Sequence, residues 1–286
     1  MTTTDTSTRA LATRAVRASS RRPRWRRGLV SLAYFVIPLA VVIGVWQLVT
    51  MLLPPAPFFP QPFAIFANLW KLLFGGPGGV TKVFTDDFLT TIGRMLLGYV
   101  IGAAWGVVVG TLMGLYRYAR ETVSPIVEFL RSIPATATLP LFIILLGGGN
   151  DMRVVFIAYG VSWFVLINTA SGVGAINKTL LDLGKVFRIS PARRLFRIIL
   201  PAAMPKIFAG LRIASTAALL LAIVSEFMLA TDGIGYLLVQ AQGRFQLLNM
   251  WSWMVALAIL GLLINFLLEW IEGRVLAWHK AARART

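Results

Sequence analysis

Residues 177–205 read NKTLLDLGKVFRISPARRLFRIILPAAMP and form a polar, basic interruption between two long apolar runs. The stretch predicts two short amphipathic helices. Thr179, with Asp182 three residues later, has the spacing of a capping box at the start of the first helix. Ser190 followed by Pro191 favours the start of the second, because serine caps helices well and proline is tolerated at the first helical position.

Each of these short helices is expected to have an apolar face and a basic side. Leu180, Leu183 and Phe187 fall on one side of the first helix. In the second helix, arginines gather on one side and aliphatic residues on another: Arg193, Arg194 and Arg197, then Leu195, Ile198 and Ile199. Pro201 and Pro205 are expected to punctuate the return to apolar sequence.

The composition indicates a membrane protein. Hydrophobic residues make up 57% of the 286 residues and charged residues only 14%, which is too apolar for a soluble chain. The net charge of +17 could suggest nucleic acid. Most of the Lys and Arg residues, however, lie in segments that would share one side of a membrane. We therefore expect the chain to be embedded in a lipid bilayer and not to bind nucleic acid. Cysteine is absent, which excludes a disulfide framework.

Hydropathy and charge predict an all-α integral membrane protein with about six transmembrane helices and both termini in the cytoplasm. Residues 1–27 predict a basic, disordered cytoplasmic tail, and residues 28–286 a transmembrane domain. The first apolar run is longer than the core of a signal peptide, so an uncleaved span is expected. The expected spans are about 29–53, 88–116, 123–147, 152–175, 205–230 and 250–272, with a cytoplasmic loop at 177–201.

Two features of the expected spans concern helix packing. Glycines recur every four residues in the second span, at positions 98, 102, 106, 110 and 114, and leave a smooth stripe that a neighbouring helix can approach closely. Packing within one chain is preferred over a seam between two copies. In the third span, Pro134 and Pro140 predict a broken helix, whose freed backbone groups either line a transport pathway or bond to neighbouring helices.

Charged residues within a membrane are costly, so each one supports a functional hypothesis by default. Arg94 lies about two turns from the outer end of the second span, and Glu226 about one turn from the outer end of the fifth. We hypothesise that they pair or share a polar network near an outer gate. The alternative is that each reaches the interface separately. Arg212 is roughly 20 Å from Glu226 along the helix, so these two cannot pair directly.

Polar side chains on the fourth and fifth expected spans are candidates for the substrate path: Ser162, Asn168, Ser215, Thr216 and Ser225. Such side chains often bond instead to their own backbone, which is kept as the alternative. The sequence contains no nucleotide-binding Gly-Lys-Ser/Thr motif and no catalytic or metal-ligating constellation. Its single histidine, His279, is interpreted as a membrane-interface residue. We therefore expect neither an enzyme nor a cofactor on this chain.

Several motifs, taken in order, resemble the permease subunits of bacterial ABC importers. Asp182-Leu183-Gly184, Arg188 and the closing Ile198-x-Leu200-Pro201 resemble the EAA loop of that family. The opening departs from the pattern, and Arg188 stands where the family usually has glycine. Further stretches resemble the nitrate, sulfonate and taurine branch: Arg131-Ser-Ile-Pro134, Leu139-Pro140-Leu141, Val186-Phe187-Arg188, Gly210-Leu211-Arg212, Ser225-Glu226 and Gly233-Ile-Gly-Tyr236.

The resemblance implies a type I importer permease (MetI-like) fold in the bacterial inner membrane. It also implies a second permease copy, expected as a homodimer, two ATPase subunits that hold ATP and Mg²⁺, and an extracytoplasmic substrate-binding protein. The basic loop would be the ATPase-coupling element, with Leu183, Phe187 and Leu195 as apolar anchors; a loop attracted to anionic lipid is the alternative. Its coupling residues are Asp182, Leu183, Gly184, Phe187, Arg188, Arg193, Arg194, Leu195, Ile198, Leu200 and Pro201.

The predicted function is the permease subunit of an ABC importer, which forms the path for a small polar or anionic organic solute. Sulfonates, taurine, nitrate, aromatic acids and vitamin precursors remain open as substrates. The alternative is a secondary transporter or channel that needs no ATPase. Such proteins commonly carry membrane-embedded acids or an inverted repeat, and in this chain only Glu226 lies deep enough, with Glu269 near an inner end. A membrane-embedded enzyme is disfavoured.

Overall fold

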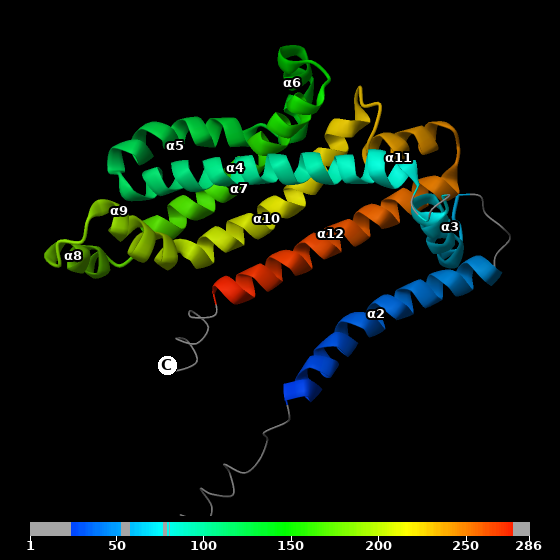
Figure 1. The fold of residues 1–286 in the computed structure, drawn as a ribbon, viewed down its shortest axis with the longest axis horizontal. Helices are drawn as coiled ribbons and strands as arrows, with labels where there is room; N and C mark the ends of the chain where they lie inside the picture. Colours follow the sequence, from blue (N-terminus) through cyan, green and yellow to red (C-terminus); the bar gives the residue numbers. More distant parts are fainter. Residues whose placement is uncertain (1–23, 53–57, 77–78, 80, 277–286) are drawn as a thin grey trace, which may run out of the picture. The chain divides into compact units, whose positions relative to one another are not determined.

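The structure is a computed structural model that describes residues 24–52, 58–76, 79 and 81–276. Within these residues the chain forms helices and no strands (Figure 1). The segments η1 and η3 are π-helical and η2 is a 3₁₀ helix. In chain order the elements are α2 (Arg24–Leu52), α3 (Pro62–Phe74), η1 (Val83–Phe88), α4 (Leu89–Leu115), α5 (Arg117–Ser132), η2 (Ala135–Thr138), α6 (Leu139–Leu146), α7 (Asn150–Gly174), α8 (Lys178–Val186), α9 (Pro191–Arg194), η3 (Leu195–Ile199), α10 (Leu200–Phe227), α11 (Ile234–Gly243) and α12 (Leu247–Val275).

The chain divides into two compact units, residues 1–63 and residues 64–286. The first unit contains α2, which begins at Arg24, so residues 24–27 of the predicted tail are helical. Arginine is a good helix former, and the charge pattern alone did not show where the helix starts. Residues 1–23 of that tail and His279 lie outside the described residues.

Four helices of the described part are long and apolar enough to cross a membrane: Val83–Leu115, Asn150–Gly174, Pro191–Phe227 and Leu247–Val275. The helices α5 and α6 add a fifth if they are counted as one broken span. The predicted first span falls on α2, whose apolar part Ile37–Leu52 is shorter than a span. The all-α membrane class is thus confirmed, with four or five membrane-length helices in the described residues where the sequence predicted about six in the whole chain.

The second unit is built around α7, which lies beside α4 and α10 (Figure 1). Its most deeply buried residues include Met152, Phe156 and Val161. The contact with α4 uses the glycine stripe: a Cβ added at Gly98 would lie 2.7 Å from the Cβ of Ile157. Side chains at these positions would therefore separate the helices. The stripe packs within one chain, as predicted.

The predicted break in the third span occurs at Pro134. Ile133 ends α5 in an extended conformation, which the residue before a proline favours. Pro140 lies in the first turn of α6, where its missing N–H is not needed, so it does not break the helix. The α5 segment and the η2–α6 segment meet at an angle of 83°.

Pro201 and Pro205 do not interrupt the chain as the sequence predicted. The helix that begins at Pro191 continues to Phe227 as one apolar helix of 37 residues. The π-helical turn η3 lies directly before Pro201. Local π adjustments of this kind let a membrane helix accommodate a proline, because they pair the backbone groups that the proline leaves free. The second short helix of the basic stretch is therefore continuous with the predicted fifth span.

A second apolar cluster joins the remaining helices of this unit. It contains Leu69 and Leu73 of α3, Ile234 of α11, and Trp253 and Leu257 of α12. A polar contact supports it, since the Asn68 amide nitrogen donates to Asn249 at 2.9 Å and to Ser252 at 3.0 Å.

The glycine stripe gives a direct test of the packing. A Cβ at Gly106 would lie 2.8 Å from the Ser162 carbonyl oxygen and 2.9 Å from the Val165 Cβ, whereas one at Gly93, on the same helix, would meet nothing within 4 Å. We expect Gly106→Ala to lower the stability of the purified protein by about 1–3 kcal/mol. Gly93→Ala should be neutral or slightly stabilising, because alanine favours helices. Thermal unfolding in detergent measures both, and equal shifts would contradict the packing.

Candidate functional site

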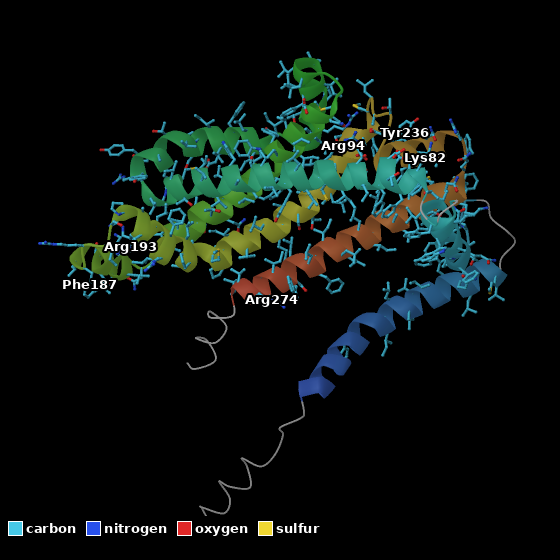
Figure 2. All side chains as sticks on the ribbon, viewed as in Figure 1. Lys82, Arg94, Phe187, Arg193, Tyr236 and Arg274 are labelled. Atoms are coloured by element: carbon cyan, nitrogen blue, oxygen red, sulfur yellow. The ribbon has the colours of Figure 1, made fainter. Side chains whose placement is uncertain are left out.

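Two groups of the predicted site residues lie at opposite ends of the helix bundle. Figure 2 shows Phe187 and Arg193 at one end and Arg94 at the other. We call residues 177–201 the coupling segment. The polar cluster around Arg94 and Glu226 is called the Arg94 network, and its further members are Asp87, Thr91, Asn150, Arg153, Asp232, Gly233 and Gly235.

A buried ion pair forms the centre of the Arg94 network. The Arg94 Nη1 atom lies 3.0 Å from Glu226 Oε1, and the two side chains are 5% and 0% exposed. The other guanidinium nitrogen, Nη2, lies 2.7 Å from Asp232 Oδ1. Arg94 also donates from Nε to the side-chain oxygen of Asn150 at 2.8 Å. One arginine on α4 therefore connects the end of α10, the turn after it and the start of α7.

The carboxylate of Glu226 has further donors. Thr91 Oγ1 lies 2.9 and 3.0 Å from its two oxygens, and the Gly235 N–H donates to Oε2 at 2.9 Å. The same threonine oxygen accepts from the Ile234 N–H at 2.9 Å. A buried carboxylate is stabilised only when such donors surround it, so the turn between α10 and α11 is held against α4.

The two glycines of the Gly233-Ile-Gly-Tyr236 motif are explained by this carboxylate. Gly233 has φ +102°, a conformation that side-chain-bearing residues rarely adopt, and its N–H donates to Asp87 Oδ1 at 2.9 Å. A Cβ at Gly235 would lie 2.8 Å from the Cβ of Glu226. Both positions need glycine because the turn wraps closely around the Glu226 side chain.

Arg153 of α7 completes the network. It is buried, its Nη2 donates to the Leu229 carbonyl oxygen at 3.1 Å, and its Nε has no hydrogen-bond partner among the described residues. Two arginines thus share the network with the three carboxylates of Asp87, Glu226 and Asp232. The cluster has no surplus positive charge with which to recruit an anion, and its contacts join helix ends to one another.

The contact between Arg94 and Glu226 is present as hypothesised from their similar depths, and a gating role remains a prediction. Sequence reasoning missed the other members. Asp87, for example, accepts a backbone hydrogen bond from Gly233, which lies 146 residues later in the chain. Arg153, a cation just inside the fourth span, was the one signal in the sequence that could have extended the network. Arg212 is paired elsewhere, with Glu272 at 2.6 Å and Glu269 at 3.6 Å.

The coupling segment begins with a different cap from the predicted one. Asn177 Oδ1 accepts the Thr179 N–H at 2.9 Å, and α8 starts at Lys178. Thr179 is therefore inside the helix, and the capping box with Asp182 is not its start. Asparagine is as good an N-cap as serine or aspartate, so the two candidates in the sequence were equivalent by residue type.

Apolar side chains of the coupling segment remain exposed. Phe187 is 73% exposed and Leu183 47%, and Phe187 lies at the tip of the bundle in Figure 2. Leu195, predicted as a third anchor, is partly buried against the cluster around Ile199, Ala203 and Ile207. Leu195 lies one helical turn before the buried Ile199 and therefore points inward. Only two of the three predicted anchors, Leu183 and Phe187, face outward.

Among the remaining predicted coupling residues, Gly184, Arg194 and Ile198 bring the two short helices together. Gly184 is buried, and a Cβ there would lie 3.2 Å from Arg194 Cδ and 3.5 Å from Ile198 Cδ1. Leu200 packs with the cluster around Ile199, and Pro201 lies in the first turn of α10. Asp182 and Arg193 are exposed on the surface of the segment. The small residue at 184 therefore lets α8 lie against the helix that leads into α10.

Arg188 has φ +50°, the left-handed conformation that glycine adopts most readily. The Ile189 N–H donates to the Gly184 carbonyl oxygen at 3.0 Å. This bond and the left-handed residue before it form a Schellman-type end of α8, with Arg188 at the position that usually holds glycine. Arg188 therefore replaces the usual glycine of the family at a position whose backbone conformation suits glycine.

Four of the five predicted path residues bond to their own helix. The hydroxyls of Ser162, Ser215 and Ser225 each donate at 2.7 Å to the carbonyl oxygen three residues earlier, and all three are buried. Asn168 donates to the Phe164 carbonyl oxygen at 2.8 Å, and Thr216 is exposed. These four side chains therefore make the backbone contacts that were kept as the alternative. A role for any of the five residues in the substrate path remains a prediction.

The described chain thus combines membrane-length helices with an exposed amphipathic segment that continues into one of them, an arrangement that suits a membrane transport subunit. Residues 102–277 match the family of binding-protein-dependent transport system inner membrane components, and the chain belongs to this family. It is a multi-pass membrane protein and the permease subunit of an ABC importer, as the resemblance implied.

Similar proteins agree with this assignment. A probable ABC transporter permease protein of Brucella abortus is 32% identical over 89% of this chain and 98% of its own length. The nitrate import permease protein NrtB of Synechococcus elongatus is 28% identical over 77% of this chain and 80% of its own. The taurine transport system permease protein TauC of Escherichia coli is 29% identical, with 91% and 95% covered. These relatives are transport permeases and not enzymes.

The fold is shared with a solved structure. A chain of the MetNI methionine ABC transporter in an inward-facing conformation superposes with a TM-score of 0.57 and 21% identity, over 66% of this chain and 94% of that one. The expected MetI-like fold of type I importer permeases is confirmed.

The conformation of Arg188 leads to a prediction about the end of α8. Arg188→Gly should stabilise this end by roughly 1 kcal/mol, because glycine adopts the left-handed conformation without the steric penalty of a Cβ. Arg188→Ala removes the same charge but keeps the Cβ and should give no such gain. Hydrogen exchange of the backbone amides of residues 183–189 measures the effect. Equal protection in the two variants would show that charge, and not conformation, governs this position.

Proposed function

We propose that this permease imports a small solute with an anionic group, of the sulfonate or nitrate kind. The relatives named above transport nitrate and taurine, and others in the same comparison transport aliphatic sulfonates and bicarbonate. Each of these solutes is small and carries a negatively charged oxygen group. Delivery by an extracytoplasmic binding protein fits the family to which the chain belongs.

We further propose that two ATPase subunits dock on the coupling segments of two copies of this chain, on the cytoplasmic side. The supporting observation is the exposed pair Phe187 and Leu183 beside Arg193 and Arg197, an apolar anchor with basic residues around it. Aromatic and arginine side chains of this kind often dominate protein interfaces. ATP and Mg²⁺ would be held by the ATPase subunits, with none on this chain, and both termini of the permease would be cytoplasmic.

The continuous helix from Pro191 to Phe227 provides the mechanical link in this proposal. Movement of the ATPase subunits would displace the coupling segment, and α10 would carry the displacement to Glu226 at its other end. The π-helical turn at Leu195–Ile199 would absorb part of the change in direction, since such turns are points of local adjustment in helices. Rearrangement of the Arg94 network would then open or close the path.

The docking proposal predicts the effect of Phe187→Asp. A buried aromatic anchor commonly contributes about 2 kcal/mol or more to an interface, so the variant should bind the ATPase about thirtyfold more weakly and lose most of it during purification from native membranes. Phe245→Asp is the matched control, because Phe245 is similarly exposed, at 78%, in the turn between α11 and α12. Mass spectrometry and ATPase activity of the purified material provide the measurement.

Two outcomes would contradict the proposal. If the unaltered chain purifies from gently treated membranes without any ATPase, the alternative of a secondary transporter would replace it. If the variants at Phe187 and Phe245 lose the ATPase equally, docking does not use the coupling segment.

A further inference from the structure

The motif Arg131-Ser-Ile-Pro134 takes no part in the coupling segment or in the Arg94 network. Arg131 stands in the last turn of α5 and lines two neighbouring cavities between α5 and α7. The larger, of about 460 Å³, is lined among others by Arg120, Ser124, Glu128, Arg131, Leu166 and Ser171. The smaller, of about 290 Å³, continues past Pro134 to Trp163 and Phe164. Arg131 thus marks the junction of the two cavities.

The depth of Arg131 is unusual for a charged side chain. In Figure 1, α5 runs beside α4 and starts at the same end of the bundle as the coupling segment. Arg131 lies about 21 Å along this helix from Arg117, at the usual rise of about 1.5 Å per residue. The hydrocarbon layer of a membrane is about 30 Å thick. With Arg117 at the inner boundary of the broken span formed by α5 and α6, this rise would place Arg131 inside the membrane layer.

Arg131 and Glu128 are both exposed, and neither makes an ion pair or hydrogen bond within the part of the chain that the structure describes. Charged side chains that faced lipid at this depth would be strongly unfavourable. Polar residues recur on the same side of α5, where Arg120, Ser124, Glu128 and Arg131 all line the larger cavity. This side of the helix consequently requires water or a polar ligand.

The charges of the larger cavity favour an anion. Arg120 and Arg131 face one carboxylate, that of Glu128. Arg120 is fixed at the end of α4, because it donates to the carbonyl oxygens of Met113 at 3.2 Å and Gly114 at 3.3 Å. The Arg131 side chain donates no hydrogen bond among the described residues. Its planar guanidinium can therefore donate two parallel hydrogen bonds to an oxyanion.

The walls of the larger cavity add to this match. The hydroxyls of Ser124 and Ser171 supply further donors from the two helices on either side. The volume lies in the range of small-molecule sites. At the junction, Tyr159 Oη donates to the Leu130 carbonyl oxygen at 3.3 Å, which ties the end of α5 to α7 and positions the residue that follows.

We propose that the cavity between α5 and α7 is a solute-binding site in the transport path and that Arg131 selects solutes that carry an oxyanion, such as a small alkanesulfonate. This inference rests on the proposed function and specifies where the negative charge of the solute is recognised. It differs from the path residues expected from the sequence, which belong to the fourth and fifth predicted spans.

The chain contains no cysteine, so a single introduced thiol reports on one position. Ser171→Cys is placed in the complex as purified from native membranes and reconstituted in lipid nanodiscs. Its labelling rate is measured with 2-sulfonatoethyl methanethiosulfonate, itself a small alkanesulfonate, and with the cationic 2-(trimethylammonio)ethyl methanethiosulfonate. Mass spectrometry of this chain alone gives the two rates, and their ratio cancels differences in thiol exposure.

We expect Arg131→Gln to lower the ratio of sulfonate to cation labelling about tenfold, since one nearby positive charge attracts the first reagent and repels the second. Arg244→Gln, an exposed arginine beyond α11, is the control and should leave the ratio unchanged. Ser124→Cys, on the opposite wall of the cavity, should reproduce the result and guards against misfolding of the first variant.

An unchanged ratio in Arg131→Gln would overturn the proposal. The proposal would also be overturned if neither reagent labelled the cysteine at position 171 or the one at position 124. A second copy of the chain or lipid would then cover this face. The labelling depends on neither ATPase binding nor transport. Failure of the docking experiment with Phe187→Asp is therefore distinguishable from failure of this one.

Discussion

The buried ion pair between Arg94 and Glu226 is the constraint on which the arrangement of the helix ends depends. Two charges removed from water are tolerated only if each is surrounded by well-placed partners. Arg94 reaches Asn150 and Asp232, and Glu226 is held by Thr91 and the Gly235 N–H. Together with Glu226 of α10, these groups come from α4, α7, the turn before α11 and the first turn of α11. The need to satisfy one pair of charges therefore determines how these elements meet.

The opposite end of the molecule has the reverse character. There the polar network is replaced by exposed apolar side chains, Phe187 among them (Figure 2). Exposure of an aromatic ring to water is unfavourable, and burial in an interface removes this cost. An exposed aromatic residue beside arginines therefore fits a segment that docks on a partner. Because the helix from Pro191 to Phe227 joins the two ends, an event at one end has a physical route to the other. The glycine stripe on α4 keeps the neighbouring helices in close contact along this route.

Much of the architecture could be predicted from local sequence properties. Hydropathy located the long helices, the spacing of glycines predicted the contact of α4 with a neighbour, and Pro134 predicted the break after α5. The pairing of Arg94 with Glu226 followed from their similar depths. The other partners of Arg94 could not be predicted, because the positions of Asn150 at the start of α7 and of Asp232 in the turn after α10 depend on how the helices pack.

Other structural features could not be predicted because the sequence offers two alternatives that local patterns do not distinguish. Asn177 and Thr179 are both good caps, and only the packed segment selects the first. Proline usually ends a helix, so the continuity through Pro201 required the π-helical turn before it. Leu195 and Leu183 look alike as apolar anchors, yet packing buries the first. The cavity beside Arg131 lies between α5 and α7, and the polar side of α5 does not by itself show which helix faces it.

The most direct test of this account is a double-mutant cycle on the central ion pair. The stability of the purified protein in detergent is measured by thermal unfolding for Arg94→Met, for Glu226→Gln and for the combination. Arg94→Met leaves the buried Glu226 without its cation, and Glu226→Gln leaves the buried Arg94 with only the partly exposed Asp232 carboxylate, so each single change should be destabilising. The combined loss should be smaller than the sum of the two by about 1–3 kcal/mol. Losses that simply add would show that Arg94 and Glu226 act independently and would contradict the central role assigned to their pairing.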